Sequence, residues 1–132
     1  MNQKNRELNI EEEVQQAKEA LKDAELLLSN QRFQGATARA YYAAFHMIQA
    51  LLLTKGLEAK SHQGVAHLFR LHFIKDQKMD PKYSQILARA QKYREEADYH
   101  YTMEFTRQQA EETLSEINDL ISAIQKHLII RR

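Results

Sequence analysis

Apolar residues recur at intervals of three and four along most of the chain, which is the period of an amphipathic α-helix. The first stripe follows Asn9, a candidate N-cap that precedes three glutamates, and acidic residues favour a helix N-terminus. It consists of Val14, Ala17, Ala20, Leu21, Ala24, Leu27 and Leu28. We therefore predict a first helix that starts at Asn9, with residues 1–8 disordered or frayed.

The second predicted helix differs from the first because it is apolar on nearly every side. Its sequence, ATARAYYAAFHMIQALLL, follows a break at residues 29–34 and precedes Gly56, a residue type that commonly ends helices. A helix that is apolar all round is packed by neighbours on every side. The pattern therefore predicts a central helix from about Gln34 to Thr54.

Capping residues mark three further helices. Ser61 can cap a third, Asp80 before Pro81 can start a fourth, and Thr106 with Gln109 has capping-box spacing for a last long one. Their apolar stripes are Val65, Leu68, Phe69, Phe73 and Ile74; Tyr83, Ile86, Leu87, Ala90 and Tyr93; and Ala110, Leu114, Ile117, Leu120, Ile121, Ile124 and Leu128. Helices joined by short connections favour an all-α fold, an antiparallel up-and-down bundle of four to five helices.

Composition supports this fold and limits the size of the molecule. The chain has 132 residues, enough for one domain, and we assign residues 1–132 to a single helical domain. Its 3 glycines and 1 proline are too few for many short strands and tight turns. The apolar tail at residues 128–130 is explained most simply by burial against another subunit, and packing within the same monomer is the alternative.

Several classes of protein are disfavoured by composition and charge. The absence of cysteine removes disulfides and thiolate chemistry, and no apolar run is long enough for a signal peptide or a membrane span, so we expect a cytoplasmic protein. A net charge of +1 argues against a protein that coats nucleic acid electrostatically. Residues 60–94 nevertheless carry eight basic and two acidic side chains, a basic block between acidic ends.

One group of polar residues lies on the central helix. Arg39, Tyr42 and His46 fall on nearly the same helix face, because seven steps of ~100° come close to two turns. A buried guanidinium is costly unless it is paired, so an anionic or carbonyl-rich partner should meet Arg39. The group is either a buried hydrogen-bond network or a functional polar pocket.

A second group lies in the segment YREEADYHY, just before the helical pattern is interrupted. It contains Arg94, Asp98 and His100, and His62 and Tyr99 are secondary pocket candidates. On a straight helix Arg94 and His100 are roughly 240° apart, so they converge only if the helix ends between them or a second subunit supplies half of the site. The alternative is that Arg94 pairs with nearby carboxylates and His100 is a surface histidine.

Other chemistries lack support in the sequence. His62, His67 and His72 recur every five residues, so each is rotated by roughly 140° from the last and they cannot share a metal-binding face of one helix. The chain has no HExxH motif, no glycine-rich phosphate loop and no GxSxG motif. We therefore predict no metal and no cofactor.

These motifs together resemble the small stand-alone HEPN-domain proteins of bacteria and archaea. The resemblance rests on ARAYYAAFHMIQALLLTKG, KSHQGV and YREEADYHY, and it runs from about residue 10 to residue 128. It implies a helical bundle, a homodimer with its functional cleft between subunits, and a minimal nucleotidyltransferase as the antitoxin partner of a HEPN toxin. Many HEPN proteins are ribonucleases whose motif is an arginine, four to six residues, and a histidine.

Two residue pairs in this chain fit that motif. Arg94 and His100 are separated by five residues and Arg39 and His46 by six, and the family's placement of the motif near the last long helix favours Arg94 and His100. The family's better-characterised toxins have a tyrosine two residues after the histidine, whereas Tyr101 here is adjacent to His100. This departure leaves tyrosine modification without support.

The resemblance suggests a metal-independent cleavage of RNA and not of DNA. Histidine would transfer protons from the ribose 2′-OH and to the leaving oxygen, and arginine would stabilise the charged phosphate. Asp98 would orient His100, and the basic block would hold the RNA backbone. The alternatives are a non-catalytic HEPN module that binds a nucleotidyltransferase or a nucleotide, and a structural dimeric bundle in which Arg39 and His46 fix helix register.

Overall fold

The computed structural model describes residues 2–99 and 104–130, and this part of the chain is helical throughout apart from its connections. The predicted all-α fold is confirmed. The elements are the helices α1 (Gln3–Ser29), α2 (Phe33–Leu53), α3 (His62–Phe69), α4 (Lys82–Tyr99) and α5 (Arg107–Ile130), and the π-helical turn η1 (Arg70–Ile74).

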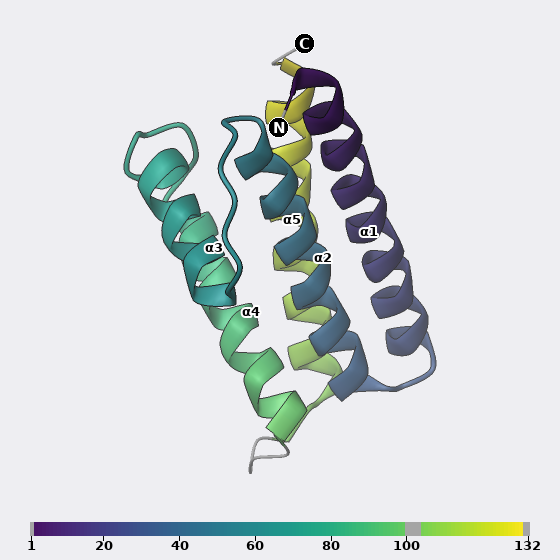
Figure 1. Ribbon diagram of the computed structural model, residues 1–132. Helices are drawn as coiled ribbons and strands as arrows, with labels where there is room; N and C mark the ends of the chain where they lie inside the picture. Colours follow the sequence, from purple (N-terminus) through teal and green to yellow (C-terminus); the bar gives the residue numbers. More distant parts are fainter. Residues whose placement is uncertain (1, 100–103, 131–132) are drawn as a thin grey trace.

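The helices form the predicted up-and-down bundle, with one departure from strict alternation (Figure 1). Helix α1 descends from the N-terminal end, α2 returns, and α4 and α5 form a second antiparallel pair. The connection between α2 and α3 runs back down the side of the bundle, so that α3 starts beside the lower half of α2 and rises in the same direction as α2. The path of this connection therefore decides which residues of α3 lie against α2.

Helix α2 is the central element, as its sequence predicts. Its buried residues include Ala36, Ala40, Ala43 and Ala44, and it packs against α1, α4 and α5. The facing residues of α1 are also alanines, Ala17, Ala20 and Ala24, each fully buried. Small side chains on both helices allow their backbones to approach closely, which explains why α1 and α2 form the most extensive contact in the bundle.

The predicted start of the first helix is wrong. Helix α1 begins at Gln3, and the side chain of Asn2, not that of Asn9, caps it by accepting a hydrogen bond from the backbone N–H of Asn5 at 2.9 Å. Residues 3–8, which the sequence suggested to be frayed, form the first turns of the helix. The apolar stripe begins earlier than predicted because Ile10, only 2 % exposed, belongs to the core.

The capping predictions for the later helices are largely confirmed. Ser61 caps α3 through Gly64 N–H, an Asp80 carboxylate oxygen accepts from Lys82 N–H, and Thr106 Oγ1 accepts from Gln109 N–H. The capping box itself is wrong, because the Gln109 side chain does not turn back to the helix start. Its Oε1 instead accepts a hydrogen bond from Thr37 Oγ1 on α2 at 3.1 Å, so it joins two helices.

The C-terminal tail fits neither prediction completely, because one of its residues packs within the monomer and another is exposed. Leu128 is 8 % exposed and belongs to the core of its own chain, as the monomer alternative requires. Ile129 is 71 % exposed. It therefore remains available for contact with another molecule.

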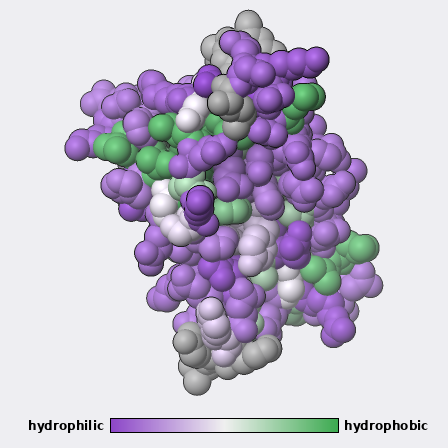
Figure 2. All heavy atoms as spheres, viewed as in Figure 1, coloured by the Kyte–Doolittle hydropathy of each residue, from purple (hydrophilic) through white to green (hydrophobic). Residues whose placement is uncertain are grey.

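The face of the molecule in Figure 2 is mainly hydrophilic, with hydrophobic patches beside α3 and the lower end of α1. Leu26, near the end of α1, is 64 % exposed. Within the described ranges, no helix is long and apolar enough to cross a membrane.

Candidate functional site

Arg94 lies on the buried face of α4. Ala90, one turn before it, and Ala97, one turn after it, are both almost fully buried. Residues spaced in this way share a helix face, so Arg94 is directed toward the bundle. Its side chain is only 12 % exposed although it carries a charge.

The contacts of the Arg94 guanidinium leave part of its hydrogen-bonding capacity unused. Nη1 donates to Oδ2 of Asp98 at 3.1 Å, and Cζ lies 5.4 Å from the centre of the Tyr41 ring on α2. Nε is buried and has no hydrogen-bond acceptor among the described residues. Burial opposes the charged form, but the bond to Asp98 and the nearby tyrosines outweigh it, so the pKa of Arg94 lies above its ordinary value. Arg94 is therefore a permanent cation largely removed from water.

Tyr41 connects Arg94 to a histidine on a different element. The side chain of Tyr41 is 1 % exposed, and its hydroxyl oxygen lies 2.7 Å from Nδ1 of His62 at the start of α3. Burial raises the pKa of Tyr41 to about 12. The phenol therefore stays protonated at neutral pH and can donate a hydrogen bond.

Aromatic rings from α2 surround the His62 imidazole. Ring centres lie 5.5 Å away for Tyr41, 6.2 Å for Tyr42 and 4.5 Å for Phe45. Burial lowers the pKa of His62 and the charge of Arg94 lowers it further, while Glu95 and Asp98 act in the opposite direction. The imidazole is therefore neutral at pH 7.

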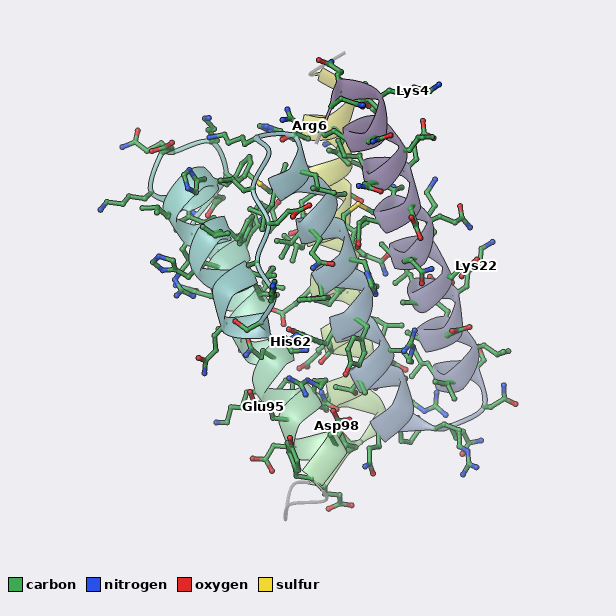
Figure 3. The ribbon with its side chains drawn as sticks, viewed as in Figure 1. Lys4, Arg6, Lys22, His62, Glu95 and Asp98 are labelled. Atoms are coloured by element: carbon green, nitrogen blue, oxygen red, sulfur yellow. The ribbon has the colours of Figure 1, made fainter. Side chains whose placement is uncertain are left out.

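The connection between α2 and α3 brings His62 to this position. Its last residue, Ser61, accepts a hydrogen bond from Gly64 N–H at 2.9 Å and fixes the start of the helix, where His62 is the first helical residue. Figure 3 shows His62 near Glu95 and Asp98 of α4, in the lower part of the view and far from Lys4 and Arg6. We call the group of Tyr41, His62 and Arg94 the Arg94 cluster.

The predicted pocket of Arg39, Tyr42 and His46 does not form as expected. Arg39 is not buried: its side chain is 41 % exposed, with Asp23 at 3.9 Å and the Tyr42 ring centre at 5.3 Å. The prediction that an anion meets Arg39 is thus confirmed. His46 Nδ1 instead lies 2.8 Å from a Glu13 carboxylate oxygen. Arg39 and His46 therefore each pair with a different acidic residue of α1.

The remaining predicted residues have different outcomes. Asp98 forms its hydrogen bond with Arg94, as the salt-bridge alternative predicted. Tyr99 is 63 % exposed at the end of α4. His100 lies outside the described residues, so its predicted convergence with Arg94 stays a prediction.

The basic block is partly neutralised by α5. Lys82 pairs with Asp119 at 3.2 Å, and Arg89 pairs with Glu116. Both cations lie on the face of α4 directed at α5, away from Arg94. The role of the block in holding RNA stays a prediction.

Sequence reasoning missed Tyr41. The doublet of Tyr41 and Tyr42 was visible, but only Tyr42 shares a helix face with Arg39 and His46, so the stripe argument selected Tyr42 and left Tyr41 out. A tyrosine at a fully buried position of a central helix needs a hydrogen-bond partner, and that requirement was the available signal. The structure supplies His62 as the partner.

The cluster has the chemistry of an anion site. It combines a guanidinium and a neutral imidazole, both of which can donate hydrogen bonds to an anion, with a protonated phenol that is bonded to the imidazole. Across the part of the chain that the structure describes, no three His, Asp or Glu side chains are arranged to hold a metal ion.

Comparisons with known proteins give consistent results. A model of the HEPN domain matches residues 10–128. The protein named Putative toxin MJ0605 from Methanocaldococcus jannaschii is 38% identical over 124 residues, which covers 91% of this chain and 92% of that protein. A UPF0332 protein from Thermotoga maritima is 36% identical over 126 residues, or 96% of this chain and 94% of that protein.

A solved structure supports the fold independently. The crystal structure of TT1696 from Thermus thermophilus superposes with a TM-score of 0.76 and covers 89% of this chain and 96% of that one. Its sequence identity is 21%, so this likeness concerns the fold alone.

Proposed function

The chain belongs to the HEPN-domain family, and from that premise we propose that it is a toxin-like, metal-independent ribonuclease. The observation that carries the proposal is the state of Arg94, a cation whose side chain is only 12 % exposed and whose charge acts on the His62 imidazole. A desolvated charge is unfavourable for folding unless it is compensated, and such groups gather at functional sites. Asp98 compensates part of this charge, and in the proposed complex an RNA phosphate adds further compensation.

In the proposed reaction Arg94 binds the phosphate and stabilises the charge that develops when the 2′-oxygen attacks. His100 remains the proposed proton-transfer residue, with Asp98 holding the Arg94 guanidinium. The products are a 2′,3′-cyclic phosphate and a 5′-hydroxyl. DNA is not cut, because it lacks the attacking hydroxyl.

The test is cleavage of single-stranded RNA by the purified protein in the presence of a metal chelator. We expect cyclic-phosphate ends, no cleavage of DNA of the same sequence, and loss of activity in His100→Ala. If chelation abolishes cleavage, or if His100→Ala cleaves as fast as the wild type, this mechanism is wrong.

The proposed partners are a second copy of the chain and a minimal nucleotidyltransferase that acts as antitoxin. The exposed Ile129 beside the buried Leu128 is one surface on which another chain could pack. Sedimentation of the purified protein tests the homodimer. Expression of the chain alone should arrest growth, and co-expression with a minimal nucleotidyltransferase encoded beside it should restore growth and yield a complex that co-purifies.

The second candidate is a HEPN module that binds a nucleotide or a nucleotidyltransferase without cleaving RNA. It is favoured by the tight pairing of Arg94 with Asp98, because a carboxylate on the guanidinium competes with an RNA phosphate. A stable complex without any nuclease activity would support it.

A further inference from the structure

We propose that His62 is held by Tyr41 as a neutral hydrogen-bond donor and that, together with Arg94 of the same chain, it holds one phosphate group of a single-stranded nucleic acid. This inference deepens the proposed function and rests on it for the identity of the ligand. It gives His62 the role of binding phosphate, and it leaves proton transfer to another group.

The surroundings of the Tyr41 hydroxyl favour one tautomer of His62. Tyr41 is 1 % exposed, and a buried hydroxyl that donates to its partner leaves no proton unpaired. Among the described residues its only hydrogen-bond partner is Nδ1 of His62, at 2.7 Å. Nδ1 is therefore the acceptor, and the proton of the neutral ring lies on Nε2, which the Tyr41 bond leaves for a ligand.

The electrostatic surroundings keep the imidazole neutral. Arg94 opposes protonation, Glu95 and Asp98 of α4 favour it, and the faces toward α2 are covered by Tyr41, Tyr42 and Phe45. Burial among these rings and the Arg94 charge prevail, so the pKa of His62 lies below its ordinary value. A neutral imidazole donates one hydrogen bond, and in a desolvated site that donor adds to the cation beside it.

Another histidine of the same helix, His67, lacks this environment. His67, one helical turn and a half further on, is exposed, and in the described ranges its side chain has no ring contact and no hydrogen bond. It therefore serves as a matched control on the same helix.

The two proposed donors come from different elements of the same chain. Arg94 comes from α4 and His62 from the start of α3, and both contact Tyr41 of the central helix. One chain can therefore supply both donors, whatever the position of a second subunit.

The first experiment measures the tautomer directly. Long-range ¹H–¹⁵N spectra of ¹⁵N-labelled wild-type protein at pH 7 should show His62 protonated on Nε2, and Tyr41→Phe should convert it to a mixture of tautomers. A wild-type His62 protonated on Nδ1 overturns the proposal.

The second experiment follows ligand binding without requiring cleavage. A 2′-O-methyl oligoribonucleotide, which has no attacking hydroxyl, should shift the signals of His62 and leave those of His67 in place. The shift should disappear in Arg94→Ala. A titration that leaves His62 unmoved overturns the inference.

The third experiment separates a donor from a base in the cleavage reaction. In His62→Gln the amide nitrogen can occupy the position of imidazole Nε2 and donate a hydrogen bond there. In His62→Asn the shorter side chain reaches only the position of Nδ1. We expect His62→Gln to stay within about tenfold of wild-type kcat/KM, and His62→Asn to fall about 100-fold. His67→Asn should match the wild type. Equal loss in both His62 variants, or full activity in both, contradicts the donor role.

These outcomes distinguish the inference from the function on which it rests. If the wild type cleaves no RNA while the oligonucleotide still moves His62, the ribonuclease proposal fails and the phosphate site stands. If the wild type cleaves RNA while the signals of His62 do not shift, the phosphate site fails and the ribonuclease proposal stands. Mixing Arg94→Ala with His62→Asn should restore no activity, and recovery would show that the two donors come from different chains.

Discussion

Helix α4 carries one arginine on each of two faces, and these arginines differ in exposure and in partners. Toward α5, Arg89 is about half exposed and pairs with Glu116, next to the Lys82–Asp119 pair. Toward α2, Arg94 is 12 % exposed and has one carboxylate, an aromatic ring and a buried Nε without an acceptor among the described residues. The two residues are separated by five positions, or roughly 140° around the helix.

The difference shows what each arginine contributes. Exposed pairs such as Arg89 with Glu116 contribute little to stability, because water and salt screen them, and their loss should be tolerated. The Arg94 guanidinium is largely buried, and burial offsets part of what its pair with Asp98 contributes to folding. Under the proposed function, this incompletely partnered guanidinium is the group that binds the RNA phosphate.

The largest expected effect separates the two arginines by activity. Arg94→Ala should lower kcat/KM for RNA cleavage by about 10²- to 10³-fold, because the phosphate loses its cationic donor. Arg94→Lys should recover little, since an ammonium cannot reproduce the guanidinium fork. Arg89→Ala is the control and should cleave at the wild-type rate. Equal rates for Arg94→Ala and Arg89→Ala would remove the distinction between the faces.

Replacement of Arg94 should lower activity but should not lower stability. Arg94→Met should leave the free energy of unfolding unchanged or raise it by about 1 kcal/mol, because an apolar side chain replaces a desolvated charge. Asp98, whose side chain is 40 % exposed, can then be solvated. Urea denaturation measures the change, with Arg89→Met as the comparison. A loss of several kcal/mol in Arg94→Met would show that this guanidinium is structural.

The exposed pair should show a weak coupling. A double-mutant cycle with Arg89→Ala and Glu116→Ala should give a coupling energy of about 0.5 kcal/mol that decreases with added salt. Thermal or urea unfolding at two ionic strengths measures it. A coupling energy above about 2 kcal/mol would show that the pair of Arg89 and Glu116 is a strong interaction, and it would contradict the distinction between the two faces of α4.

The smallest expected effect is a dependence of stability on pH. The pKa of His62 and that of His127, which lies against Phe73 near Lys55 and Lys78, are both lowered, in each case mainly by burial. The unfolded chain then binds more protons than the folded one, so stability is complete above pH ~6.5 and declines as the pH falls through the folded pKa values. Denaturant midpoints between pH 7.5 and 5 should show this decline, and His62→Asn should reduce it. A midpoint that rises on acidification would contradict the assigned direction.

The sequence predicted the bundle because helix formation and burial are recorded locally. The alanine-rich stripe of α1, the all-round apolar α2 and the caps at Ser61, Asp80 and Thr106 each depend on residues a few positions apart. The start of α1 was misjudged because Asn2 and Asn9 are equally good caps by residue type. Only the burial of Ile10 favours the earlier start.

The candidate site was predictable only in part. Arg94 and Asp98 stand one helical turn apart, so their pairing could be read from spacing. The meeting of Tyr41 with His62 could not, because their contact spans 21 positions and depends on the path of the connection after α2. Residue spacing describes neighbours on one helix, and it contains no information on how a connection returns along a bundle. The sequence thus determined the helices and the charge of Arg94, while tertiary packing decided that this charge is desolvated and has an imidazole beside it.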